Sequence, residues 1–165
     1  MNVSFIGVGA IGLPMAKRLI PHCNVTVFDL ATDRVRELVR LGATAAESAA
    51  KAAAASETVI IMVATPEQLD QALFGPDGAA EGLKIGSTAI IMSSVGIDSV
   101  TSVAERLKNH NVRVVDAPVT GGVVRAITGE LTILTSGADE DIAVLIAQDD
   151  RQTHENQEKS EDRAS

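Results

Sequence analysis

The sequence predicts an α/β fold built on a doubly wound parallel sheet, and three observations carry this prediction. Short runs rich in Val and Ile alternate with stretches whose apolar residues recur at helical spacing. Three of these runs are almost continuously apolar, which is typical of strands that helices cover on both faces. A glycine-rich turn also joins the first strand to the first helix, as this fold class requires.

The first half of the chain supplies two strand–helix units. Residues 2–9 and 24–30 carry Val, Ile and Phe at strand density, whereas 13–20 and 31–42 place their apolar residues on one helical face. Gly42 is expected to end the second helix as its C-cap. Each unit therefore reads as a strand followed by a crossover helix.

The next stretch, 47–56, is nearly pure Ala, the residue with the highest helix propensity, and Ser48 is suited to cap it. We expect a short, smooth helix packed closely on the sheet. The remaining elements are predicted as strands 58–66, 87–94, 112–118 and 131–137, a helix over 98–109, and a last helix that begins at 138–147.

The composition limits the classes of function that the sequence is compatible with. A length of 165 residues suits one domain, and a formal charge of −8 argues against a nucleic-acid partner, because phosphate backbones need a basic face. No apolar run is long enough to cross a bilayer and no signal peptide is apparent, so the expected location is cytoplasmic, without a membrane partner. The single Cys23 fits a reducing compartment and is expected to be a small buried hydrophobe.

The stretch GVGAIG has G-x-G-x-x-G spacing between a strand and a helix. Such glycines permit a tight turn, a close approach of a pyrophosphate, and close packing of helix on strand, while the pyrophosphate meets the helix N-terminus. The loop therefore predicts a dinucleotide-binding site of the Rossmann type. Its expected cofactor-binding residues are Gly7, Val8, Gly9, Ala10, Ile11 and Gly12.

Asp29 ends the second predicted strand. A carboxylate at this place accepts hydrogen bonds from the ribose hydroxyls and repels a 2′-phosphate, so NAD is favoured over NADP. The next residue, Leu30, stands where an arginine would bind that phosphate, and Arg34 on the following helix is expected to face solvent.

Two longer motifs resemble the β-hydroxyacid dehydrogenase family, which includes 3-hydroxyisobutyrate, tartronate semialdehyde and L-threonate dehydrogenases. One is FIGVGAIGLPMAKRLI, with Pro-Met-Ala directly after the third glycine; the other is DAPVTGGVVRAITGELTILTSG over 116–137. The resemblance covers about residues 2–142. It implies an N-terminal cofactor domain and a small β-hydroxyacid as substrate, with hydride transfer to or from the nicotinamide.

The resemblance also implies individual site residues. Thr120, Gly121 and Gly122 would form a substrate-binding turn, although the glycines could merely turn the chain. Ser94 takes the position of a cofactor-contacting Thr, and Arg125 either meets an acidic substrate or faces solvent. The loop after the strand 58–66 would add cofactor contacts, unless it serves as a loop only; its residues are Val63, Ala64 and Gln68.

The family's catalytic lysine belongs to a helical C-terminal domain for which the sequence has no counterpart, so no catalytic residue is assigned within this chain, and no metal site is expected. The predicted organisation is an NAD(P)-binding domain over 1–147 and a polar, disordered tail over 148–165. The tail departs from the family pattern, as a truncation or a change of reading frame would cause. The alternative is an acidic tail that interacts with a partner.

Three hypotheses therefore stand. The chain is the cofactor domain of an oxidoreductase that does not turn over alone, a non-enzymatic dinucleotide-binding module, or a decayed fragment. In the last of these, an uncovered sheet edge and an apolar surface would promote self-association.

Overall fold

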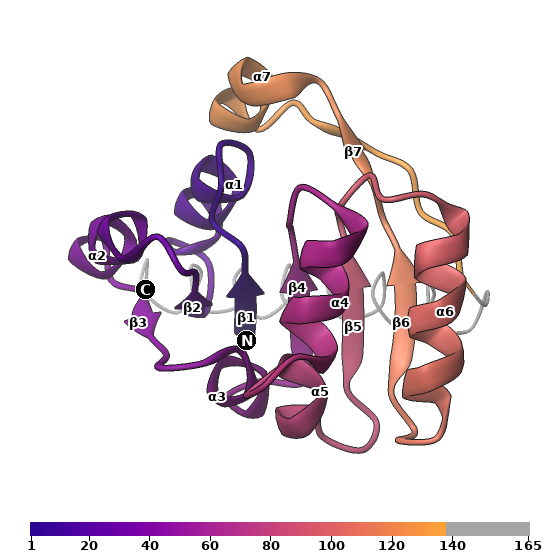
Figure 1. The fold of residues 1–165 in the computed structure, drawn as a ribbon. Coiled ribbons are helices and arrows are strands. Elements are labelled where there is room, and N and C mark those ends of the chain that lie inside the picture. Colours follow the sequence, from indigo (N-terminus) through magenta and orange to yellow (C-terminus); the bar gives the residue numbers. More distant parts are fainter. Residues whose placement is uncertain (138–165) are drawn as a thin grey trace, which may run out of the picture.

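A six-stranded parallel sheet forms the centre of the computed structural model, which describes residues 1–137. Its strands are β1 (Asn2–Ile6), β2 (Asn24–Phe28), β3 (Thr44–Ala45), β4 (Thr58–Ile61), β5 (Thr88–Ile91) and β6 (Arg113–Asp116). They follow the order β3-β2-β1-β4-β5-β6, and each neighbouring pair is parallel. All carboxyl ends therefore lie along one edge, the upper edge in Figure 1. The predicted doubly wound α/β fold is confirmed.

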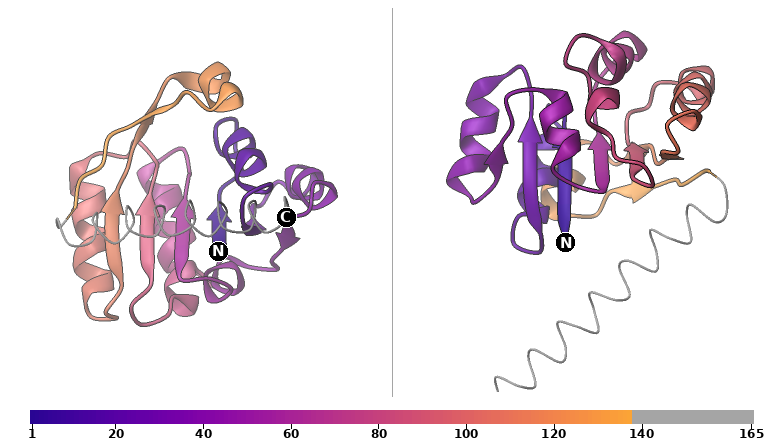
Figure 2. Two further views of the ribbon diagram at one scale, coloured as in Figure 1. Left: turned by 180° about the vertical axis from the view of Figure 1, so that it is seen from behind. Right: turned by 90° about the horizontal axis from the view of Figure 1, so that it is seen from below.

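Helices cover both faces of this sheet (Figure 2). On one face lie α1 (Gly12–Leu19) and α2 (Thr32–Arg40); on the other lie α3 (Ala49–Ala54), α4 (Pro66–Phe74), α5 (Ala79–Gly82) and α6 (Ile97–Lys108). Side chains alternate between the two cores along a strand, so that Val59 and Ile61 join the α3–α6 core and Ile60 joins the α1–α2 core. Burial on both faces explains why these strands are almost continuously apolar.

The Ala-rich helix α3 is as smooth as predicted and packs closely. Ser48 caps it by accepting a hydrogen bond from the Lys51 N–H at 3.1 Å. Ser4 Oγ on β1 is hydrogen-bonded to the Ala52 carbonyl, so the helix is tied directly to the central strand. On its other side, a Cβ at Gly82 would overlap the Ala50 carbonyl oxygen, which shows how close α5 lies.

One predicted strand is wrong. Residues 131–137 do not form a sixth strand of the parallel sheet; only Thr132–Ile133 (β8) is a strand, and it pairs antiparallel with β7 (Val119–Thr120) in a separate two-stranded sheet. The sixth position is taken by β3, which pairs with β2. Two exposed residues carry no apolar alternation, so β3 gives no sequence signal.

Other differences concern helices and limits. The sequence pattern did not indicate α4, α5 or α7 (Gly122–Thr128). The strands are shorter than predicted; the one predicted over 58–66 ends at Ile61, and Pro66 already begins α4. The predicted helix over 138–147 and the tail over 148–165 lie outside the described residues. Within residues 1–137 no helix has the length and hydropathy to cross a membrane.

Candidate functional site

The candidate site lies between β1 and β4, at the point where the order of the strands in the sheet reverses. From β1 the chain proceeds to β2 and β3 on one side, and from β4 to β5 and β6 on the other. In open α/β sheets, ligands bind outside the carboxyl ends of the strands at this switch point. Here the β1–α1 loop (residues 7–11) and the β4–α4 loop (residues 62–65) emerge side by side from β1 and β4.

The β1–α1 loop is held by its glycines. Gly7 has φ +91°, donates its N–H to the Phe28 carbonyl at 3.0 Å, and leaves no room for a Cβ beside the Met62 carbonyl. Gly12 leaves none beside the Gly7 carbonyl. The turn therefore packs between β2, β4 and α1 only with glycine at both positions.

The same loop presents free donors. Within residues 1–137, the backbone N–H groups of Gly9, Ala10 and Ile11 donate no hydrogen bond, and they precede the first residues of α1. A Cβ at Gly9 would meet nothing closer than Arg34 Nη1, at 3.8 Å. Unpaired N–H groups at a helix N-terminus beside an open glycine are suited to a phosphate group. The loop thus fits the dinucleotide that its sequence predicts.

Asp29, at the end of β2, braces this loop. Its Oδ2 accepts the Val8 N–H at 2.6 Å, and its Oδ1 accepts the Ala31 N–H at 2.7 Å. The Val8 N–H is therefore engaged within the protein, and the buried Val8 side chain belongs to the core. Since a carboxylate accepts about four hydrogen bonds, Asp29 retains capacity for ribose hydroxyls.

The β4–α4 loop is fixed by two side chains. Ser93 Oγ accepts the Val63 N–H at 2.8 Å, and Gln68 Oε1 accepts the Ala64 N–H at 2.9 Å. The structure brings Val63, Ala64 and Gln68 together, with Gln68 in contact with the loop itself; their predicted contacts with a cofactor stay a prediction. Ser94 is exposed and makes no hydrogen bond among the described residues. Its buried neighbour Ser93, which sequence reasoning missed, was marked only by a hydroxyl at the end of an apolar run.

Ser93→Ala is expected to lower the free energy of unfolding by about 1–3 kcal/mol, because the partly buried Val63 N–H loses its acceptor. Ser94→Ala is the matched control and should change it by less than about 0.5 kcal/mol, since Ser94 is exposed. Urea unfolding followed by circular dichroism measures both variants. Equal effects of the two substitutions would contradict the assigned role of Ser93.

The predicted substrate turn follows β6. Thr120 pairs with Thr132 in the β7–β8 ribbon, and Gly121 and Gly122 have φ +129° and +70° as α7 begins. Arg125 folds back, and its Cδ would lie 2.7 Å from a Cβ at Gly121. Thr120, Gly121 and Gly122 are exposed. The turn therefore presents to solvent a hydroxyl and two glycines whose backbone conformations other residues rarely adopt, with an arginine beside them.

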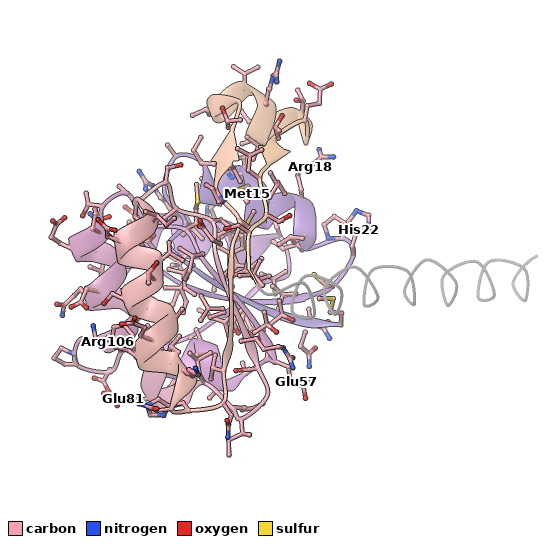
Figure 3. All side chains as sticks on the ribbon, turned by 90° about the vertical axis from the view of Figure 1, so that its right-hand side faces the viewer. Met15, Arg18, His22, Glu57, Glu81 and Arg106 are labelled. Atoms are coloured by element: carbon pink, nitrogen blue, oxygen red, sulfur yellow. The ribbon has the colours of Figure 1, made fainter. Side chains whose placement is uncertain are left out.

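A contact between α1 and α7 places this turn above α1 (Figure 1). Arg18 Nη1 donates to the Ile127 carbonyl at 3.3 Å, and the Arg18 guanidinium occupies the place that a Cβ at Gly129 would take. Figure 3 shows Arg18 on α1 beneath α7. A cation at a helix C-terminus is favourable, so Arg18 links the two segments. No sequence pattern indicates this pairing, because Arg18 and Ile127 are separated by more than 100 residues.

Two of the described groups outside the glycine loop have pKa values that burial changes. Burial raises the pKa of Asp116 at the end of β6 and raises the pKa of the half-buried Cys23 thiol, which donates to the Leu19 carbonyl. His22 and His110 are exposed. In the described part of the chain, no group of three or more His, Cys, Asp or Glu side chains could hold a metal ion.

Comparison with known proteins agrees with this geometry. Residues 2–146 match the family described as the NAD binding domain of 6-phosphogluconate dehydrogenase. The chain is 32% identical over 149 residues to an L-threonate dehydrogenase of Cupriavidus necator, covering 90% of this chain and 50% of that protein. It is 36% identical over 141 residues to a 2-(hydroxymethyl)glutarate dehydrogenase of Eubacterium barkeri, covering 85% and 46%.

Among solved structures, a 3-hydroxyisobutyrate dehydrogenase from Salmonella typhimurium superposes with a TM-score of 0.80 at 30% identity. The superposition covers 87% of this chain and 50% of that one. The chain spans about half the length of the curated relatives that it matches.

Proposed function

Because the chain belongs to the β-hydroxyacid dehydrogenase family, as the NAD(P)-binding domain that its members share, we propose that it binds NAD along the carboxyl edge of the sheet. The activity that this site serves is hydride transfer between the nicotinamide and a small β-hydroxyacid. When bound, the dinucleotide supplies the hydride acceptor or donor. The residues described here bind and orient it.

The observation that carries the proposal is the β1–α1 loop. Three adjacent unpaired N–H groups and an open Gly9 provide a cradle for the pyrophosphate. Asp29 would hold the adenosine ribose, while Val63, Ala64 and Gln68 line the loop on the other side of the switch point. Ser94, in the segment that follows β5, would add a further contact to the cofactor.

The preference for NAD over NADP rests on Asp29. Its carboxylate lies at the end of β2 and would repel a ribose 2′-phosphate. Arg34 is a cation close to Gly9, yet it is exposed and therefore screened by solvent. The carboxylate is held in place by two backbone N–H groups, whereas no hydrogen bond or ion pair with another of residues 1–137 fixes the Arg34 side chain.

A direct titration with NADH, followed by the fluorescence of the cofactor, tests this proposal. The chain has no Trp or Tyr to interfere. We expect saturable binding that is roughly ten-fold tighter for NADH than for NADPH, as a repulsion of about 1.4 kcal/mol would give. A folded chain that binds neither cofactor would refute the proposal, and equal affinities would refute the assigned preference.

The substrate half of the proposal concerns Thr120, Gly121 and Gly122. The relatives named above are dehydrogenases of L-threonate, 2-(hydroxymethyl)glutarate and 3-hydroxyisobutyrate, each a small hydroxyacid. A substrate carboxylate suits a turn that offers a hydroxyl and backbone N–H groups with little side-chain bulk. The contact of α7 with α1 supports this assignment, because it keeps the turn near the cofactor helix.

We further propose that residues 1–147 bind cofactor without turning over a substrate on their own. Proton transfer from the substrate hydroxyl needs a positioned group. Lys17 is paired with Glu37 at 2.5 Å and Lys51 is paired with Glu47. Lys84 and Lys108 precede β5 and β6, at the opposite edge of the sheet. We also propose that residues 148–165 are a polar tail outside this domain and that the protein is located in the cytoplasm.

A further inference from the structure

The backbone of the β4–α4 loop is anchored to three separate elements. The Met62 N–H is bonded to the Ile6 carbonyl on β1 at 2.8 Å, the Val63 N–H to Ser93 after β5, and the Ala64 N–H to Gln68 on α4. Three consecutive donors are thus engaged by groups that are far apart in the sequence. These three bonds therefore hold the backbone of the loop to β1, to the segment after β5 and to α4.

This loop forms one wall of the cradle. A Cβ at Gly7 would overlap the Met62 carbonyl oxygen and lie 3.2 Å from Val63 Cγ1. Hence the β4–α4 loop and the β1–α1 loop are in van der Waals contact. A displacement of the former by a few tenths of an ångström would alter the support beneath Gly7 and the N–H groups that follow it.

The bond from Gln68 is not required to satisfy a buried group. Ala64 and Gln68 are both exposed, so water could accept the Ala64 N–H in place of the carboxamide. The side chain also loses rotamer freedom in making the bond, which leaves little net stabilisation of the fold. Its effect is to select one position of the loop.

We infer that Gln68 and Ser93 are positioning residues, which hold the β4–α4 loop at the distance from the glycine loop that a bound dinucleotide requires. Ser93 fixes the inner end of the loop from the buried side, and Gln68 fixes the outer end from α4. This inference rests on the proposed function. It assigns Gln68 a role through Ala64, whereas the sequence predicted a direct contact with the cofactor.

The test uses Gln68→Met on the full chain, because Met has a similar length and lacks a strong acceptor. Gln71→Met is the matched control: Gln71 is an exposed glutamine on the same helix, and its side chain makes no hydrogen bond among the described residues. We expect Gln68→Met to weaken NADH binding about 3- to 10-fold, the effect of one hydrogen bond, and Gln71→Met to change it by less than about two-fold.

Two further readouts separate positioning from a general structural effect. Amide hydrogen exchange at Ala64 should accelerate in Gln68→Met, while the thermal unfolding midpoint stays that of the wild type. Gln68→Glu keeps an oxygen acceptor of the same size, so amide exchange at Ala64 should stay at the wild-type rate in this variant, as in Gln71→Glu, which adds the same charge on the same helix. A side chain that acts only by filling space would instead leave Gln68→Met with wild-type affinity, because Met and Gln are similar in length.

The outcomes are distinguishable. If the wild type binds NADH and Gln68→Met binds it equally well, or if Ala64 exchanges at the wild-type rate in that variant, the inference is wrong and the proposed function stands. If the folded wild type does not bind NADH, the proposed function fails and the inference fails with it.

Discussion

Gly9→Val is expected to abolish measurable NADH binding while leaving the fold intact. Gly9 is not among the glycines with positive φ, and a Cβ there would meet nothing closer than Arg34 Nη1 at 3.8 Å. The fold therefore has room for a Cβ at this position, and we expect it to accept the valine. Its methyl groups would instead occupy the space beside the unpaired N–H groups, which the pyrophosphate needs.

The expected loss is about 100-fold or more in affinity, because two charge-assisted hydrogen bonds are worth roughly 3 kcal/mol or more together. Cofactor fluorescence measures the binding, and circular dichroism checks the fold. Arg34→Ala is a useful control, since it shows whether displacing that guanidinium alone weakens binding. Wild-type affinity in Gly9→Val would remove the glycine loop from the site.

Gly12→Ala is expected to destabilise the whole domain. A Cβ at this position would overlap the Gly7 carbonyl oxygen and lie 3.2 Å from Cε1 of the fully buried Phe5. Neither group can move freely, because Gly7 is itself packed against Met62. Overpacking of this kind costs about 3 kcal/mol, a large part of the 5–15 kcal/mol that is typical of a domain.

Urea unfolding measures this effect, and Gly9→Ala is the matched control. It adds the same methyl group in the same loop, but where the structure has room, so its free energy of unfolding should stay within about 0.5 kcal/mol of the wild type. The two variants thus separate the glycine that packs from the glycine that binds. Similar unfolding curves for both would show that α1 does not lie as close to β1 as described.

The sequence determined the elements whose signal is local. Five strands of the parallel sheet, the amphipathic helices α1, α2 and α6, and the Ala-rich helix α3 follow from periodicity, propensity and capping, which neighbouring residues express. The glycine loop and Asp29 were likewise readable, because the turn after β1 and the end of β2 have fixed places in this fold class.

The tertiary structure decided what depends on pairing between distant segments. The short strand β3 exists because β2 offers it an edge. Residues 131–137 run antiparallel to their neighbours instead of joining the parallel sheet, since β8 pairs with β7 and Ser136 bridges Asp116 on β6. The hydrogen bonds that Val63 N–H donates to Ser93, and that Arg18 donates to Ile127, join residues whose separation in sequence gives no periodic signal. Which polar side chains hold the loops of the candidate site, and which only lie near them, is decided when the strands pair in the sheet.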